Sequence, residues 1–244
     1  MHEDQQLGEG SFGIVFKGTF RNNTFVTKKM KEVTQNEEEM KEFNKEVTML
    51  DKFCDPYIVH FYGAVFTPNK ICMVTEFAEI GSLKDLMRKI QNSPINEEVR
   101  IKMLLDAAKG IEYLHNNGIL HRDIKSDNIL LFDIGHNDNS FINVKLTEFG
   151  SVRNLKMSMT NMSFTNGIGT PIYKATEVFN RQHYKKPSDI YSFALTMYEY
   201  MKCGDAYQKE QFQHPWNNAY FDMKGDRLTK SEDVKDEMYE LITQ

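Results

Sequence analysis

The stretch His121-Arg122-Asp123-Ile124-Lys125-Ser126-Asp127-Asn128 decides how the rest of the sequence is interpreted. It gathers an acid, a cation and an amide directly before the apolar run Ile129-Leu130-Leu131, which is typical of a short buried strand. A strand this short does not need Asp, Lys and Asn at its entrance for packing. A site that handles anionic oxygens and a divalent metal does need them. The stretch therefore predicts a functional loop, and a polar turn between a helix and a strand is the competing interpretation.

Length and composition narrow the class of protein. The chain has 244 residues, of which 40% are hydrophobic, so it can bury a substantial core as one large domain or two lobes. Its net charge of −5 gives no indication of nucleic-acid binding. Cys54, Cys72 and Cys203 are widely spaced, which argues against a disulfide framework or a zinc site and for a reducing compartment.

The sequence also predicts where the chain resides. It contains no run of about 18 apolar residues, and its first residues are too polar for a signal peptide. We therefore expect a segment that does not insert into a membrane. Its expected location is the cytoplasm, either alone or as the intracellular domain of a larger protein.

A glycine-rich stretch lies near the N-terminus, where Gly8, Gly10 and Gly13 form G-x-G-x-x-G. A dinucleotide-binding fingerprint would open a helix. Here Ile14-Val15-Phe16 are β-branched and aromatic, so the glycines are predicted to lie in a hairpin between two strands. Glycines in such a turn let backbone N–H groups approach phosphate oxygens. A plain hairpin turn is the alternative.

Lys28 falls within the predicted strand 24–30. An inward lysine on a half-buried strand is costly unless it is paired, so this position predicts an anionic partner. Residues 36–50 are predicted to form a helix with an apolar stripe, and Glu46 lies beside that stripe. Glu46 is therefore the candidate partner of Lys28.

The remaining segments are ordered as strands followed by helices. Residues 55–63 are predicted to begin a strand pair that ends at 71–78. An amphipathic helix over 96–116 leads to the functional loop. A hydrophobic helix over 188–198 carries Asp189 near its N-terminus, and further helix is expected over 231–243.

Together these segments resemble a eukaryotic protein kinase domain over the whole chain, residues 1–244, because H-R-D-x-x-x-x-N and the glycine motif occur in the expected order. Lys125 after Asp123 resembles the Ser/Thr kinases of the tyrosine-kinase-like group. The resemblance implies an α+β, bilobal fold. A small antiparallel β-sheet lobe with one helix, plus the hinge, is expected over 1–78. A larger, mainly helical lobe is expected over 79–244, lacking its final helices.

The resemblance also implies an activity, the transfer of the γ-phosphate of ATP to Ser or Thr hydroxyls of protein substrates. Asp123 would accept the proton of the substrate hydroxyl, and Lys125 would stabilise the transferring phosphoryl group. Lys28 with Glu46 would orient ATP. Asn128 and Glu148 would hold Mg²⁺, or alternatively Mn²⁺. The other residues implied to bind the nucleotide are Gly8, Gly10, Ser11, Gly13, Val15, Val26, Thr75, Glu76, Ala78, Ser82 and Leu130. A helix cap is the alternative role for Ser82.

Glu148 is the main departure from the family pattern, because Glu148-Phe149-Gly150 stands where D-F-G is expected. Mg²⁺ prefers near-octahedral oxygen ligands at about 2.0–2.1 Å. Glutamate keeps the charge and the oxygens but adds one methylene, and a misplacement of about 1 Å can cost about 10²-fold in rate. The alternative function is therefore that of a pseudokinase, a nucleotide-binding or allosteric scaffold in signalling.

Residues 151–169 are rich in Ser, Thr, Met and Asn and resemble an activation segment. A phosphate added there could pair with Arg122, because charge-assisted hydrogen bonds to arginine are strong. In the following stretch, Thr176 replaces the proline of A-P-E and Glu177 is kept. The candidate sites for an upstream kinase or for self-phosphorylation are Ser158, Thr160, Ser163 and Thr165.

Overall fold

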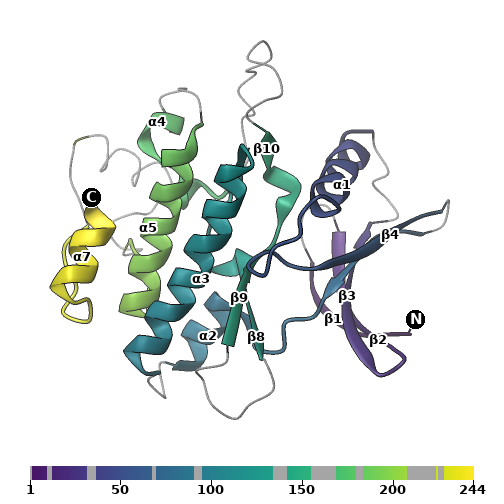
Figure 1. Ribbon diagram of the computed structural model, residues 1–244, viewed down its shortest axis with the longest axis horizontal. Helices are drawn as coiled ribbons and strands as arrows, with labels where there is room; N and C mark the ends of the chain where they lie inside the picture. The colour runs from purple at the N-terminus through teal and green to yellow at the C-terminus, as the bar shows by residue number, and fades with distance from the viewer. Residues whose placement is uncertain are drawn as a thin grey trace.

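The computed structural model describes residues 2–9, 13–31, 37–67, 70–90, 95–133, 142–154, 169–179, 184–207, 224 and 228–244. Figure 1 shows a β-sheet with one helix, α1, on one side of the molecule and a mainly helical part on the other. The predicted α+β, bilobal kinase-like architecture is confirmed. No helix within the described ranges is long and apolar enough to cross a membrane.

The first part of the chain forms a five-stranded antiparallel sheet in the order β1-β2-β3-β5-β4. Arg21 and Asn22 connect β2 to β3, and their positive φ values of 49° and 65° fit the primed two-residue turns of hairpins. The helix α1 packs its apolar stripe, including the buried Phe43 and Leu50, into the core. The elements are β1 (His2–Glu9), β2 (Gly13–Phe20), β3 (Asn23–Met30), α1 (Glu37–Leu50), β4 (Phe61–Thr67) and β5 (Lys70–Glu76).

The second part is mainly helical and contains two small sheets, β6-β8-β9 and β10-β7. Its elements are β6 (Gly81–Ser82), α2 (Leu83–Ile90), α3 (Glu97–Asn116), β7 (Ile119–Leu120), η1 (Ser126–Asn128), β8 (Ile129–Asp133), β9 (Ile142–Leu146), η3 (Phe149–Ser151), β10 (Arg153–Asn154), η4 (Pro171–Tyr173), α4 (Thr176–Phe179), α5 (Lys186–Lys202) and α7 (Asp236–Thr243).

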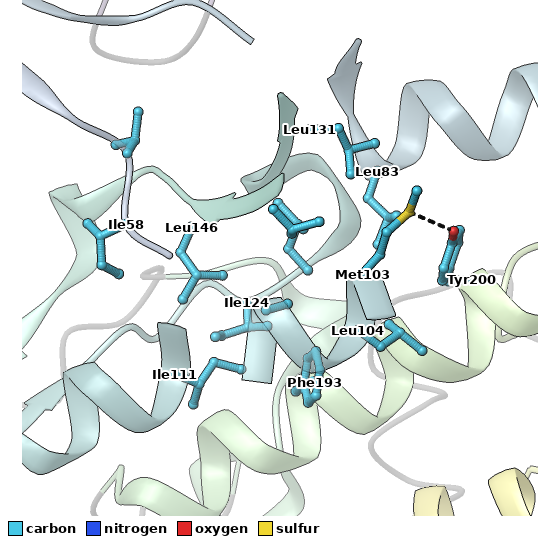
Figure 2. Close-up of a cluster of buried hydrophobic side chains, with 14 of the residues drawn as sticks. Ile58, Leu83, Met103, Leu104, Ile111, Ile124, Leu131, Leu146, Phe193 and Tyr200 are labelled. Carbon is cyan, nitrogen blue, oxygen red and sulfur yellow. Dashed lines mark hydrogen bonds between the residues drawn. The ribbon is translucent and has the colours of Figure 1, made fainter. Parts of the chain in front are cut away.

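The core of this part is formed by α3, α5 and the strands beside them. Figure 2 shows Met103 of α3 facing Tyr200 of α5, whose hydroxyl donates a hydrogen bond to the Met103 sulfur at 3.1 Å. Gly110 lets α3 approach β9 closely, because a Cβ there would lie 2.9 Å from the Tyr57 carbonyl oxygen and 3.0 Å from Leu146. This packing fixes the strands that carry the functional loop.

Two predicted boundaries were wrong. The helix expected over 231–243 begins only at Asp236, as α7. The strand expected from residue 55 begins at Phe61, because the preceding residues pair with β9 instead. The Leu146 N–H donates to the Tyr57 carbonyl at 2.8 Å, and the Val59 N–H donates to the Leu146 carbonyl at 3.0 Å. The segment after α1 is therefore attached to the helical part before it enters the sheet.

Candidate active site

A cleft of 1280 Å³ lies between the five-stranded sheet and the helical part. It brings together all the predicted site residues that the structure describes. Gly10 and Ser11 lie outside the described residues. The predicted residues that line the cleft are Gly8, Gly13, Val15, Val26, Lys28, Glu46, Thr75, Glu76, Ala78, Ser82, Asp123, Lys125, Asn128, Leu130 and Glu148.

The two described glycines of the motif lie on paired antiparallel strands, Gly8 on β1 opposite Val15 and Gly13 on β2, as the sequence predicts. A Cβ at Gly13 would lie 2.4 Å from the carbonyl oxygen of Lys29, so this position requires glycine for packing. A Cβ at Gly8 would meet no atom within 4 Å. Gly8, which also lines the cleft, is therefore not required for packing as Gly13 is.

Lys28 lies on β3 and forms the expected ion pair with Glu46 of α1. Its Nζ atom donates to the Glu46 oxygens at 3.0 and 3.2 Å, and also to both Glu148 oxygens at 3.0 Å. Burial alone would lower the pKa of Lys28, but the two carboxylates outweigh burial and raise that pKa above its ordinary value. Burial raises the pKa of Glu46 despite the opposing charge of Lys28. Lys28 is therefore held as a cation between two carboxylates.

Glu148 adopts a left-handed backbone conformation, with φ of 65° and ψ of 69°. A non-glycine residue there carries a cost of roughly 1–2 kcal/mol. Its side chain is 45% exposed and lines the cleft, and its carboxylate contacts Lys28. This contact was not predicted from the sequence, where Glu148 was assigned only to a metal.

Asp123 is the centre of a second charged cluster. One of its oxygens, Oδ1, accepts from the N–H and the hydroxyl of Thr170, each at 2.9 Å. The other, Oδ2, lies 3.1 Å from Lys125 Nζ and accepts from Asn128 Nδ2 at 3.0 Å. Lys125 also donates to the Thr170 hydroxyl at 2.7 Å. The cluster therefore joins the functional loop to the segment that begins at Gly169.

The protonation state of Asp123 follows from these contacts. Burial alone would raise its pKa, but the charge of Lys125 and the hydrogen bonds from Lys125 and Thr170 lower it below its ordinary value. Asp123 is therefore an ionised carboxylate at neutral pH, as an acceptor of a proton must be. Thr170 was missed by the sequence reasoning, although a hydroxyl beside Gly169 and Pro171 was the available signal.

The backbone of the functional loop is attached to Asp189, near the start of α5. This fully buried carboxylate accepts from the N–H groups of His121 and Arg122 at 3.0 and 2.9 Å. It also bonds His115 Nε2 and the Tyr184 hydroxyl, each at 2.9 Å. Burial alone would raise the pKa of Asp189, but the bonds from His115 and from the backbone of His121 and Arg122 lower it. Asp189 therefore acts on the loop and is more than a favourable charge at a helix start.

Aromatic contacts connect this loop to the segment that carries Glu148. The Phe149 ring contacts two other rings. Its centroid lies 5.4 Å from that of His121 and 5.2 Å from that of Phe53. His121 Nε2 also bonds the Thr147 carbonyl at 2.9 Å. The backbone on either side of Glu148 is therefore fixed by the helical core.

Ser82 forms a reciprocal helix cap with Asp85 at the start of α2. The Ser82 hydroxyl and N–H donate to Asp85 Oδ2 at 2.7 and 3.0 Å, and the Asp85 N–H donates to the Ser82 hydroxyl at 3.1 Å. This is the geometry of a capping box. The cap, considered as the alternative to ribose binding, is therefore present.

The residues after the activation segment bond to α5. Ser188 donates to Glu177 at 2.7 Å, and the Tyr173 hydroxyl donates to the buried Glu199 at 2.6 Å. Burial raises the pKa of Glu199. The predicted phosphorylation sites Ser158, Thr160, Ser163 and Thr165 all lie outside the described residues.

Comparison with known families decides the class of this site. The protein kinase domain family matches residues 1–244, which is the whole chain. The chain belongs to the protein kinase family. The family resemblance carried by the sequence motifs is thereby confirmed. Protein kinase domains in general use ATP and a divalent metal ion.

Curated relatives of this kinase domain are named as Ser/Thr kinases. The "Probable serine/threonine-protein kinase gdt9" of Dictyostelium discoideum is 32% identical over 225 residues, or 81% of this chain and 14% of the relative. "Serine/threonine-protein kinase CTR1" of Arabidopsis thaliana is 35% identical over 217 residues, or 88% of this chain and 24% of the relative. This kinase domain spans between 11% and 30% of the curated relatives it matches.

Proposed function

We propose that this chain is the catalytic domain of an active Ser/Thr protein kinase, with a nucleotide-binding lobe and hinge over residues 1–78 and a substrate-binding lobe over 79–244. The observation that carries the proposal is the cluster of Asp123, Lys125 and Thr170 in the same cleft as the Lys28–Glu46 pair. This arrangement supplies an ionised carboxylate and two cations where a nucleotide phosphate and a hydroxyl would meet.

Lys28, Asp123 and Lys125 each have a separate proposed role in the reaction. The Lys28 ammonium, oriented by Glu46, binds phosphate oxygens of ATP. The Asp123 carboxylate accepts the proton of the substrate hydroxyl as that oxygen attacks the γ-phosphorus, and the bond from the γ-phosphorus to the bridging oxygen breaks to release ADP. Lys125 stabilises the charge on the transferred phosphoryl group, since a fixed cation in a partly desolvated site acts strongly on developing charge.

The donor set in the cleft fits a divalent metal. The Asn128 Nδ2 atom is engaged as a donor to Asp123 O and Oδ2 at 2.7 and 3.0 Å, so its oxygen is the atom that Asn128 can offer a cation. The Glu148 carboxylate lines the same cleft. Among the described residues, no group of three or more His, Cys, Asp or Glu could hold a metal ion. Mg²⁺ at nucleotide sites takes one or two carboxylates together with phosphate oxygens, and Asn128 and Glu148 would hold it, or Mn²⁺, in that way. When bound, the metal neutralises phosphate charge.

A pseudokinase scaffold is the second candidate function, and one observation favours it. Both Glu148 oxygens accept hydrogen bonds from Lys28. Glu148 is the residue proposed to hold the metal, and Lys28 is the residue proposed to bind phosphate, so each engages the group that the other needs free. Glu148 is therefore proposed to slow the kinase, or in the alternative to reduce it to nucleotide binding without transfer.

The test is transfer of the labelled γ-phosphate of ATP, with Mg²⁺ and then Mn²⁺, to the chain itself and to a generic basic protein. Wild type is compared with Asp123→Asn and Glu148→Asp. A working kinase loses turnover in Asp123→Asn and gains turnover in Glu148→Asp. Transfer only by Glu148→Asp supports the scaffold, and no transfer by any of the three proteins overturns the catalytic proposal.

Regulation and location follow as part of the same proposal. Phosphorylation at Ser158, Thr160, Ser163 or Thr165, by an upstream kinase or by the chain itself, would set activity through negative charge in the activation segment. The chain is proposed to act on proteins in the cytoplasm, alone or as part of a larger protein. The proposal involves no nucleic acid and no direct membrane insertion by this segment.

A further inference from the structure

Glu76 and Lys145 form an ion pair between the sheet and the helical part. Lys145 Nζ donates to the two Glu76 oxygens at 2.6 and 2.8 Å. Both side chains are largely buried, with 17% of Glu76 and 14% of Lys145 exposed. An ion pair this well bonded and this far from solvent fixes relative position, unlike an exposed pair on a protein surface.

The Glu76 carboxylate also holds the backbone of a third segment. It accepts from the His60 N–H at 2.6 Å, and the Glu76 N–H donates to the His60 carbonyl at 3.0 Å. The carboxylate therefore accepts three hydrogen bonds from two donor groups, the Lys145 ammonium and the His60 N–H. Its hydrogen-bonding capacity is used for internal contacts, although Glu76 lines the cleft together with Thr75 and Ala78.

Lys145 lies where three parts of the site meet. It is on β9 and pairs with Leu130 of β8, which lines the cleft. The next residue of β9, Leu146, holds residues 57–59 through backbone hydrogen bonds, and Glu148 follows shortly after. Lys145 Nζ also lies 4.8 Å from the centre of the Phe132 ring, in a cation–π contact. One lysine thus joins the end of β5, the segment after α1, and the strand that leads to Glu148.

We propose that Lys145 is a positioning residue for the nucleotide. By holding the Glu76 carboxylate, it fixes the backbone of residues 75–78 at the edge of the cleft. The N–H and C=O groups of these residues are thereby positioned to form hydrogen bonds with an adenine ring. This inference rests on the proposed function, because ATP is the ligand whose binding it sets. Loss of the lysine leaves a buried carboxylate without its cation, and that carboxylate must move to water.

The experiment compares Lys145→Met with Lys145→Arg and with Lys102→Met as a matched control. Lys102 pairs with Asp106 at 2.6 Å and donates to the carbonyl of Ile142, so it contacts the opposite end of β9 without lining the cleft. Loss of the Lys102 ammonium therefore loosens β9 at a site away from the nucleotide. For each purified protein, affinity for a fluorescent ATP analogue, kcat at saturating ATP and amide hydrogen exchange over residues 73–78 are measured.

We expect Lys145→Met to weaken binding of the analogue by about tenfold and to leave kcat at saturating ATP within about twofold. Exchange over residues 73–78 should accelerate by about tenfold. Lys145→Arg should restore both values, and Lys102→Met should change neither. Unchanged affinity in Lys145→Met, or an equal loss in Lys102→Met, overturns the inference.

The exchange measurement separates this inference from the proposed function. If wild type binds no ATP analogue, the proposed nucleotide-dependent function fails. Exchange over residues 73–78 then still decides whether Lys145 fixes this segment, and wild-type rates in Lys145→Met reject that role.

Discussion

The Lys28 ammonium donates hydrogen bonds to both carboxylate oxygens of Glu148, each at 3.0 Å, while it also holds Glu46. Two carboxyl groups thus share one ammonium group at the place where phosphate groups are proposed to bind. Glu148 competes with those phosphates for Lys28.

Replacing Glu148 with Gln should therefore strengthen binding of ATP when no metal is present. The amide keeps the size of the side chain and removes the charge that repels phosphate, so we expect affinity to rise by about threefold to tenfold, a modest gain because Glu148 is partly solvated. Isothermal titration with ATP in the presence of a chelator measures this change. Equal or weaker binding by Glu148→Gln would contradict the competition.

Thr170 should matter to catalysis more than to folding. Replacing it with Val removes the hydroxyl between Asp123 and Lys125 but keeps the backbone N–H bond to Asp123. Because the reacting groups lose part of their alignment, we expect kcat to fall by about tenfold to a hundredfold. Steady-state kinetics tests this expectation, and Thr170→Ser, which retains the hydroxyl, is the control that should stay close to wild type. Equal kcat values for Thr170→Val and Thr170→Ser would show that the Thr170 hydroxyl has no part in the reaction.

The two described glycines of the glycine motif should respond differently to alanine. Gly13→Ala places a methyl group 2.4 Å from the Lys29 carbonyl oxygen, and we expect it to lower the free energy of unfolding by about 1–3 kcal/mol. Gly8→Ala enters open space and should leave stability close to wild type. Urea unfolding monitored by circular dichroism checks both. Equal stability of the two variants would refute the steric distinction.

Acid should destabilise the fold through Asp189. The folded-state pKa of Asp189 is lowered, so its contribution to stability is fully present above the unfolded-state value of about 3.9 and is lost as pH falls through the lower folded-state value. Urea unfolding of wild type between pH 6 and pH 3, as an approximate range, should show this decline. Asp189→Asn should be less stable at neutral pH and should show a shallower decline. An identical slope in the two proteins would assign the acid sensitivity to other carboxylates.

The sequence predicted the parts of the site that depend on local pattern. The β-branched residues after the glycines placed Gly8 and Gly13 in a hairpin. The cost of burying Lys28 required an acid, and the apolar stripe of α1 placed Glu46 within reach of it. These inferences succeeded because strand and helix periodicities determine which residues share a face.

The missed contacts depend on chain geometry that periodicity does not contain. Glu148 contacts Lys28 from a left-handed backbone position that L-residues rarely adopt, so no strand pattern predicts its direction. Thr170 meets Asp123 across 47 positions of sequence, after the activation segment. Lys145 and Glu76 stand on strands of different sheets, and their pairing depends on how those sheets are placed together.

The four donors of Asp189 come from α3, from the functional loop and from Tyr184, two residues before α5 begins. A loop held this way cannot loosen while α3 and α5 stay packed, because the buried carboxylate would lose its partners without gaining water. The helical core and the loop form one cooperative unit. On heating, loss of the loop's geometry and melting of those helices should occur as a single transition at one temperature.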